Sequence, residues 1–220
     1  MSPLLANVLL DEVDQELERR GHSFVRYADD CNVYVRSKRA GERVMQALQG
    51  MYRRLRLRIN EKKSAVARPW ERKFLGYSFW VAPGRVVKRK VAPRALETMR
   101  QRVRQITRRT RGRNLQAVIG ELARYLNGWW QYFRLSETPN VFRETDQWIR
   151  RRLRVMQLQH WGRRGTTVYR ELTKRGLERG LALRVARYRR HWWAFAKSKG
   201  VSIALPVQYY DQMGLPRLAR

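Results

Sequence analysis

Hydrophobic residues recur at helical spacing in two segments near the start of the chain. In the first, Ser2 and Pro3 are typical of a helix N-terminus, and Gly21 is typical of the residue that follows a helix. The predicted apolar face of this helix comprises Leu5, Leu9, Val13 and Leu17. Asp11 and Asp14 fall within the same helix, where we interpret them as polar helix residues. The second helix has a predicted apolar face of Val44, Leu48, Met51 and Leu55.

Between these helices, two β-prone runs enclose a pair of adjacent acidic residues. Residues 24–27 precede the pair and residues 33–35 follow it, which predicts two strands. Asp29 and Asp30 are turn-prone, so we expect a hairpin with both carboxylates at its tip. Carboxylates this close repel each other unless a cation lies beside them, and Mg²⁺ is a hard cation that prefers oxygen ligands. An ordinary β-turn is the alternative.

Strand signals continue to about residue 92 and then give way to helical ones. Residues 57–59 alternate in polarity, residues 74–81 form a predicted strand, and residues 82–84 form a predicted turn into residues 85–88. Basic helices are then predicted at about 94–109, 114–134, 139–160, 166–175 and 180–198. The predicted fold class is therefore α+β, with a boundary near Ala92 and Pro93.

Two of the later helices have distinctive faces. The helix at 114–134 has a wide stripe of Leu122, Tyr125, Leu126, Trp129, Tyr132 and Phe133. We interpret this stripe as core, with a base-stacking platform as the alternative. The apolar face of the helix at 139–160 is formed by Phe142, Ile149, Leu153 and Met156. Its remaining surface is predicted to be crowded by Arg150, Arg151, Arg152 and Arg154.

The charge balance indicates a polyanionic partner. The chain has 49 basic and 18 acidic residues among 220, a formal net charge of +31. Nucleic acid is the partner that this excess favours, and an anionic membrane surface is the alternative. No apolar run is long enough to span a bilayer and no signal peptide is recognised, so we expect a cytoplasmic protein with no membrane association. The single cysteine, Cys31, excludes an internal disulfide and is expected to pack as a small hydrophobe beside the acid pair.

Several short blocks follow one another in a fixed order along the chain. SPLLAN lies at residues 2–7, the YADD hairpin at 24–35, a block ending in Lys63 and Ser64 at 57–64, and FLGY at 74–77. Two further blocks, at 126–133 and 148–161, are rich in tryptophan and arginine. Together these blocks resemble a group II intron reverse transcriptase/maturase. The resemblance implies a partial reverse-transcriptase palm at 1–92 and an all-α thumb and maturase-specific RNA-binding domain at 93–220.

The same resemblance implies roles for individual residues. Asp29 and Asp30 would be the catalytic Mg²⁺ ligands, and Lys63 would assist the pyrophosphate leaving group. Nucleotide or primer contacts are expected from Tyr27, Ala28, Asn60, Leu75, Gly76 and Tyr77. RNA contacts are expected from Arg108, Arg109, Arg150, Arg151, Arg152, Arg154, Arg163 and Arg164. The alternatives are a solvated lysine at 63, a core aromatic at 27, a strand bulge at 76, and solvated faces for the arginine clusters.

The family's palm also uses a third carboxylate, on a strand upstream of the SPLLAN block. Because that block follows Met1 directly, we expect this carboxylate and the fingers to lie outside the chain. A DNA-cutting domain built on Cys and His is not expected at residues 200–220, which contain neither. We therefore expect a reverse transcriptase/maturase fragment that binds structured intron RNA, and possibly a DNA target, to assist splicing and mobility. An RNA-binding module without polymerase activity and a degraded mobile-element remnant are the alternatives.

Overall fold

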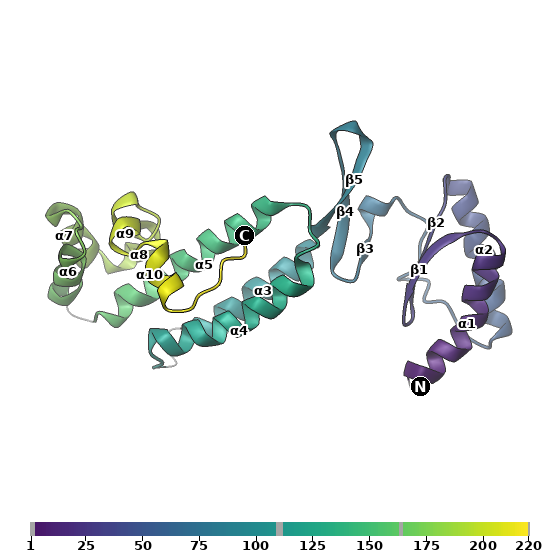
Figure 1. Ribbon diagram of the computed structural model, residues 1–220, viewed down its shortest axis with the longest axis horizontal. Helices are drawn as coiled ribbons and strands as arrows, with labels where there is room; N and C mark the ends of the chain where they lie inside the picture. Colours follow the sequence, from purple (N-terminus) through teal and green to yellow (C-terminus); the bar gives the residue numbers. More distant parts are fainter. Residues whose placement is uncertain (1–2, 109–111, 163–164, 220) are drawn as a thin grey trace. The chain divides into compact units, whose positions relative to one another are not determined.

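The computed structural model describes residues 3–108, 112–162 and 165–219. It divides into two compact units, Met1–Phe79 and Trp80–Arg220. Helices predominate and two small antiparallel sheets accompany them, which confirms the predicted α+β class (Figure 1). The domain assignment of 1–92 and 93–220 stays a prediction.

The first unit begins with a helix, a hairpin and a second helix. These are α1 (Pro3–Arg19), β1 (Ser23–Tyr27), β2 (Asp30–Tyr34) and α2 (Lys38–Arg54). Gly21 ends α1 as predicted: its φ is 70°, and the N–H of His22 donates to the carbonyl of Leu17 at 3.0 Å. Ser37 caps α2, because its hydroxyl accepts a hydrogen bond from the N–H of Ala40 at 3.2 Å.

The core of the first unit lies between α1 and α2, with the hairpin packed against it. Leu10, Val13 and Leu17 are buried together with Met51 of α2. The predicted apolar face of α1 was wrong at its start, since Leu5 is 62% exposed. Residues at a strict four-residue spacing rotate by about 40° per step around a 3.6-residue helix. Over three steps the row therefore winds away from the core, and Leu10 takes the buried place.

The sheet that follows contains a second hairpin that the sequence reading missed. Its strands are β3 (Lys73–Phe74), β4 (Tyr77–Ala82) and β5 (Val86–Val91), in the order β3-β4-β5. The single strand predicted at 74–81 is broken at Leu75 and Gly76, whose φ values are 50° and 76°. Two consecutive residues with positive φ are typical of a tight hairpin turn, which a glycine permits at little cost. The predicted turn at 82–84 is confirmed by the 3₁₀ turn η2 (Pro83–Arg85).

The second unit continues as a helical array. Its helices are α3 (Pro93–Ile106), α4 (Leu115–Phe133), α5 (Pro139–His160), α6 (Gly165–Lys174), α7 (Arg179–Arg187), α8 (Trp192–Phe195), α9 (Lys199–Ala204) and α10 (Val207–Gln212). The single helix predicted at 180–198 is instead interrupted after α7. The backbone of Tyr188 leaves the helical region (φ −98°, ψ 66°), and the indole N–H of Trp192 donates back to the carbonyl of Val185 at 2.8 Å.

The aromatic stripe of α4 forms part of the core of this unit. Leu122 and Leu126 are fully buried, and Trp129 is nearly so. The ring of Trp129 lies 4.8 Å from the ring of Phe133 and 5.9 Å from that of Phe142 on α5. The core interpretation is therefore confirmed for Leu122, Leu126, Trp129 and Phe133. It is wrong for Tyr132, which is 53% exposed, and Tyr125 is half-buried. Among the described residues, no helix is both long and apolar enough to cross a bilayer.

Candidate metal-binding hairpin and nucleic-acid surface

The acidic pair lies at the tip of the β1–β2 hairpin, as predicted. Tyr27 pairs with Asp30, which leaves Ala28 and Asp29 as the two-residue turn. Ala28 has a φ of 52°, a left-handed conformation that non-glycine residues adopt infrequently. Asp30 is the first residue of β2, so it lies beside the turn rather than within it.

Both carboxylates at the tip are open to solvent. Asp29 and Asp30 are exposed, and the carboxylate of neither makes a hydrogen bond or an ion pair with another described residue. Tyr27 is 63% exposed, so the alternative that it is a core aromatic is wrong. The hairpin thus presents two acidic side chains and one aromatic side chain to whatever binds there.

Arg26 ties the hairpin tip to α1. Its guanidinium donates to both carboxylate oxygens of Asp14, at 2.5–2.8 Å, in a half-buried pair. The same group donates to the side chain of Asn7 and to the carbonyl of Ala28, each at 3.0 Å. The hydrogen bond with Asp14 raises the pKa of Arg26. One side chain therefore bridges the helix and the strained residue next to the acidic pair.

Asp14 and Arg26 were missed as site-supporting residues by the sequence reading. We had interpreted Asp14 as a polar helix residue, but it lies on the face of α1 turned toward the hairpin. The sequence alone does not identify Asp14 as the partner of Arg26, because any acidic residue on a neighbouring helix could form that ion pair. Cys31, opposite Arg26 in the ladder, packs against the core as expected, and burial raises the pKa of its thiol to about 11.

Replacing Arg26 by alanine is expected to destabilise the first unit by about 2 kcal/mol, because charged hydrogen bonds at a half-buried site are lost. Amide hydrogen exchange at residues 24–34 measures this locally. A double-mutant cycle with Asp14→Ala should give a coupling energy of about 1–3 kcal/mol. Additive effects in that cycle would contradict the pairing. Arg58→Ala is the control, since it removes an exposed arginine of the same unit.

The hairpin fits a magnesium ion with few protein ligands. Among the described residues, no three His, Cys, Asp or Glu side chains form a group that could hold a metal. Mg²⁺ usually keeps several waters and takes only one or two carboxylates from the protein. Asp29 and Asp30 supply that donor type at one place. A cation-binding role for the pair is therefore chemically consistent.

The other nucleotide-site candidates lie in two turns of the first unit. The carbonyl of Asn60 accepts from the N–H of Lys63 at 3.0 Å and from that of Ser64 at 2.9 Å, and Lys63 is exposed. Leu75 and Gly76 form the β3–β4 turn, with Tyr77 at the start of β4. Gly76 therefore occupies a hairpin turn, which differs from the strand bulge considered as its alternative. Convergence of these turns on the acidic hairpin stays a prediction.

The expectation that four arginines of α5 crowd its outer surface was wrong for two of them. Arg150 is 4% exposed and Arg154 is 9% exposed. Arg154 donates to the carbonyls of Leu205 at 3.0 Å and Ala196 at 3.4 Å, and burial lowers its pKa. Both guanidiniums are covered by segments from the end of the chain. They serve the interior of the protein and are not available to RNA phosphates.

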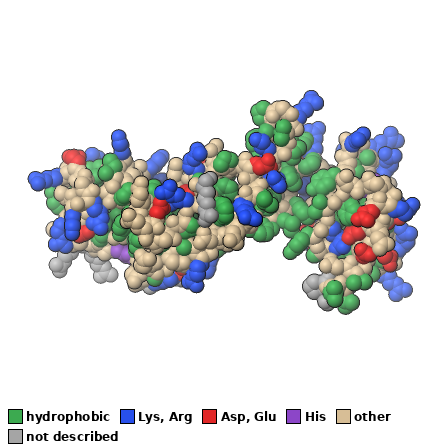
Figure 2. All heavy atoms as spheres, in the orientation of Figure 1, with side chains coloured by type: hydrophobic (Ala, Val, Ile, Leu, Met, Phe, Trp, Pro, Cys, Tyr) green, Lys and Arg blue, Asp and Glu red, His purple; other side chains and the backbone are tan. Residues whose placement is uncertain are grey.

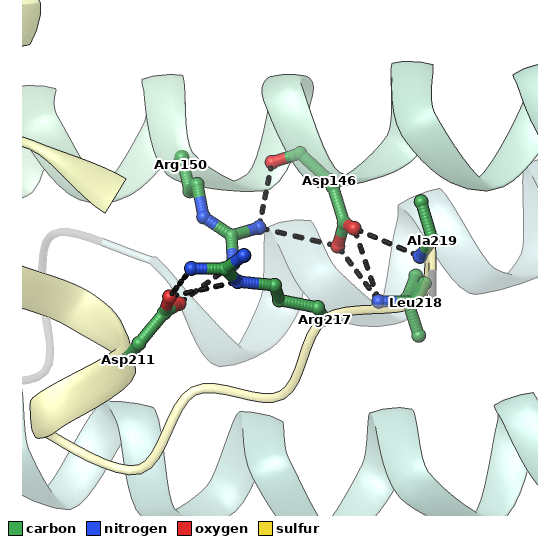
Figure 3. A network of polar contacts seen from close by, with 6 residues as sticks. All are labelled: Asp146, Arg150, Asp211, Arg217, Leu218 and Ala219. Atoms are coloured by element: carbon green, nitrogen blue, oxygen red, sulfur yellow. Dashed lines mark hydrogen bonds and ion pairs between the residues drawn. The ribbon is translucent and has the colours of Figure 1, made fainter. Parts of the chain in front are cut away.

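Arg150 belongs to a polar network that holds the C-terminal segment against α5 (Figure 3). It lies 3.2 Å from a carboxylate oxygen of Asp146 and 2.9 Å from one of Asp211. Asp146 also accepts hydrogen bonds from the backbone N–H groups of Leu218 and Ala219, at 3.0–3.2 Å. Burial alone would raise the pKa of Asp211, but its hydrogen bonds with Arg217 and Arg150 lower it.

The remaining arginine candidates differ in their surroundings. The guanidinium of Arg151 lies 4.0 Å from the ring centre of Trp193 and donates to that residue's carbonyl, and Arg152 donates to the hydroxyl of Thr107 at 2.9 Å. Arg108 is exposed. Three other candidates, Arg109, Arg163 and Arg164, lie outside the described residues. Lys and Arg side chains are nonetheless spread over the visible face of each unit, and acidic side chains also gather on the face of the first unit (Figure 2).

Comparison with known families assigns both parts of the chain. Residues 1–79 match the family described as reverse transcriptase (RNA-dependent DNA polymerase), and residues 96–176 match the group II intron, maturase-specific domain. No curated protein matches the chain. The first family implies a divalent metal in general, and both imply nucleic-acid partners. The order of the two domains and the blocks within them show that this chain belongs to the group II intron reverse transcriptase/maturases.

Proposed function

We propose that the β1–β2 hairpin is the metal-binding part of a polymerase palm. The observation that supports this most directly is the pair of exposed, unengaged carboxylates of Asp29 and Asp30, held on a turn that Arg26 fixes to α1. These residues fall within the segment that matches the reverse transcriptases. A solvated β-turn would not need a half-buried arginine to hold its strained residue.

In this proposal, Asp29 is the principal ligand of Mg²⁺ and Asp30 supports it. Bound Mg²⁺ would stabilise charge on the attacking and leaving oxygens of nucleotidyl transfer. Tyr27 and Ala28 would flank the nucleotide, and Lys63 would neutralise or protonate the pyrophosphate group. Asn60 and the turn of Leu75, Gly76 and Tyr77 would contact the nucleotide or primer. The protein's part in this chemistry is to hold these side chains in place before substrate arrives.

We further propose that the helical part of the chain, as the thumb and maturase-specific region at 93–220, binds structured intron RNA. Its basic residues would position the RNA through phosphate contacts. Of the arginines suggested by sequence, Arg108 and the exposed parts of Arg151 and Arg152 remain in this role, and Arg150 and Arg154 do not. A DNA target would be accommodated by the same phosphate chemistry.

Binding of structured RNA is expected to weaken steeply with salt. If about eight phosphates are neutralised, log K should fall with log salt at a slope of roughly −6 to −7. A fourfold rise in salt would then weaken binding by roughly three to four decades. Filter binding or fluorescence anisotropy with a folded intron RNA measures the slope. A slope near zero would show that the net charge of +31 is not an RNA-binding surface.

A further inference from the structure

A cavity of about 310 Å³ lies between α6 and α7, outside every site discussed above. These two helices pack side by side (Figure 1). The cavity is lined by Gly165, Thr166, Tyr169, Leu183, Ala186 and Arg187. Its walls are mostly apolar, and its volume falls within the range of about 300–1,000 Å³ that is usual for small-molecule sites.

The cavity has a structural cause. Val168, Leu172, Ala182 and Val185 are completely buried between the helices and fix their separation. Gly165 lets the start of α6 approach α7, since a Cβ there would lie only 3.1 Å from the carbonyl oxygen of Ala186. Beside this close contact, the side chains of Tyr169 and Leu183 line the cavity. The cavity is therefore built by the helix packing.

The walls combine two kinds of chemistry. Leu183 is 59% exposed and contributes an apolar side chain to the wall of the cavity. Tyr169 contributes a half-buried ring. Arg187 contributes a guanidinium, which lies 5.8 Å from the ring centre of Tyr188. Aromatic and guanidinium groups together suit a flat, π-faced group that carries negative charge nearby.

The charge around the cavity favours a polyanion over a neutral molecule. Cationic residues of the two helices include Arg170, Lys174, Arg179, Arg184 and Arg187. The two acids nearby are engaged: Glu171 pairs with Arg175 at 2.6 Å, and Glu178 accepts from the N–H of Gly180 at 3.2 Å. A flat apolar group tethered to phosphates is a nucleobase of RNA. In folded RNA, unstacked bases occur in loops and bulges.

We propose that this cavity receives one unstacked nucleobase of the bound RNA, an inference that rests on the proposed RNA binding. The base would lie against Tyr169 and Leu183. Arg187 would meet the adjoining phosphate. The helical region would then recognise RNA shape as well as charge, because a fully paired helix has no base to offer.

The test compares two RNA hairpins, one fully paired and one with a single-nucleotide 2-aminopurine bulge. We expect the protein to bind the bulged RNA about 10-fold more tightly, and the fluorescence of 2-aminopurine to change on binding. Leu183→Ser, which removes the apolar wall, and Thr166→Trp, which fills the cavity from an exposed position, should each abolish the preference. The salt slope should stay unchanged in both, because neither change removes a cation.

Ile203→Ser is the matched control, since Ile203 on α9 is also 59% exposed. It should leave the preference intact. If both cavity variants behave like Ile203→Ser, or if the wild-type protein does not prefer the bulged RNA, the cavity does not receive a base. If the wild-type protein binds neither RNA in a salt-dependent way, the proposed RNA binding itself is wrong. These two failures are thus distinguishable.

Discussion

When the chain is completed by the expected upstream strand and fingers, replacing Asp29 by alanine is expected to lower Mg²⁺-dependent primer extension by about 1,000-fold or more. Removing a single group that stabilises charge in a transition state typically lowers the rate by about 100- to 1,000-fold. Asp29 would hold the Mg²⁺ ion that stabilises this charge, so its removal should cost at least as much. RNA affinity should hardly change, because a carboxylate contributes no phosphate contact. The measurement is extension of a labelled primer on an RNA template, together with RNA binding by the same protein preparation.

A second readout for Asp29 does not depend on polymerase activity. Fe²⁺ substituted for Mg²⁺, with hydrogen peroxide as oxidant and ascorbate to regenerate Fe²⁺, should cleave the backbone near residues 27–31 through locally generated hydroxyl radicals, and Asp29→Ala should abolish this cleavage. Glu12→Ala is the control, since it removes an exposed carboxylate from α1 of the same unit. Cleavage that persists in Asp29→Ala, or extension that survives it, would refute the assignment of this residue as a metal ligand.

Replacing Arg150 by alanine is expected to reduce the free energy of unfolding of the second unit by about 3 kcal/mol. Removing one partner of a buried ion pair typically costs about 3–5 kcal/mol. The lower end applies here, because Asp211 keeps Arg217 and Asp146 keeps its two backbone donors. The C-terminal segment should also loosen, which proteolysis or amide exchange at residues 211–219 would detect. The salt slope of RNA binding should not change.

Arg108→Ala is the control for Arg150→Ala, because it removes an exposed arginine instead of a buried one. Arg108 is exposed, so its removal should leave stability within about 0.5 kcal/mol. If it contacts a phosphate, the salt slope should fall by about one. An Arg150 variant that kept full stability and lost RNA affinity would reverse our interpretation and return Arg150 to the RNA-binding surface. Denaturant unfolding followed by tryptophan fluorescence, with parallel RNA titrations, separates these outcomes.

The sequence by itself determined the elements whose signals are local. The acidic hairpin formed where β-prone runs enclose two turn-prone residues, and Gly21 ended α1 because few other residues adopt its backbone conformation readily. The helix predicted at about 139–160 spans Pro139–His160. The apolar stripe around Trp129 was correctly interpreted as core except at Tyr132, which lies at its exposed edge.

Only the tertiary structure decided the role of each charged side chain. Arg150 and Arg154 look like surface residues in sequence, but the partners that bury them come from residues 196–211, about 40–60 positions further along the chain. The same is true of Asp14, whose function became visible only when the hairpin placed Arg26 against α1. A repeat of apolar residues shows which face of a helix is covered. It does not show which distant segment covers it, nor which polar side chains that segment will satisfy.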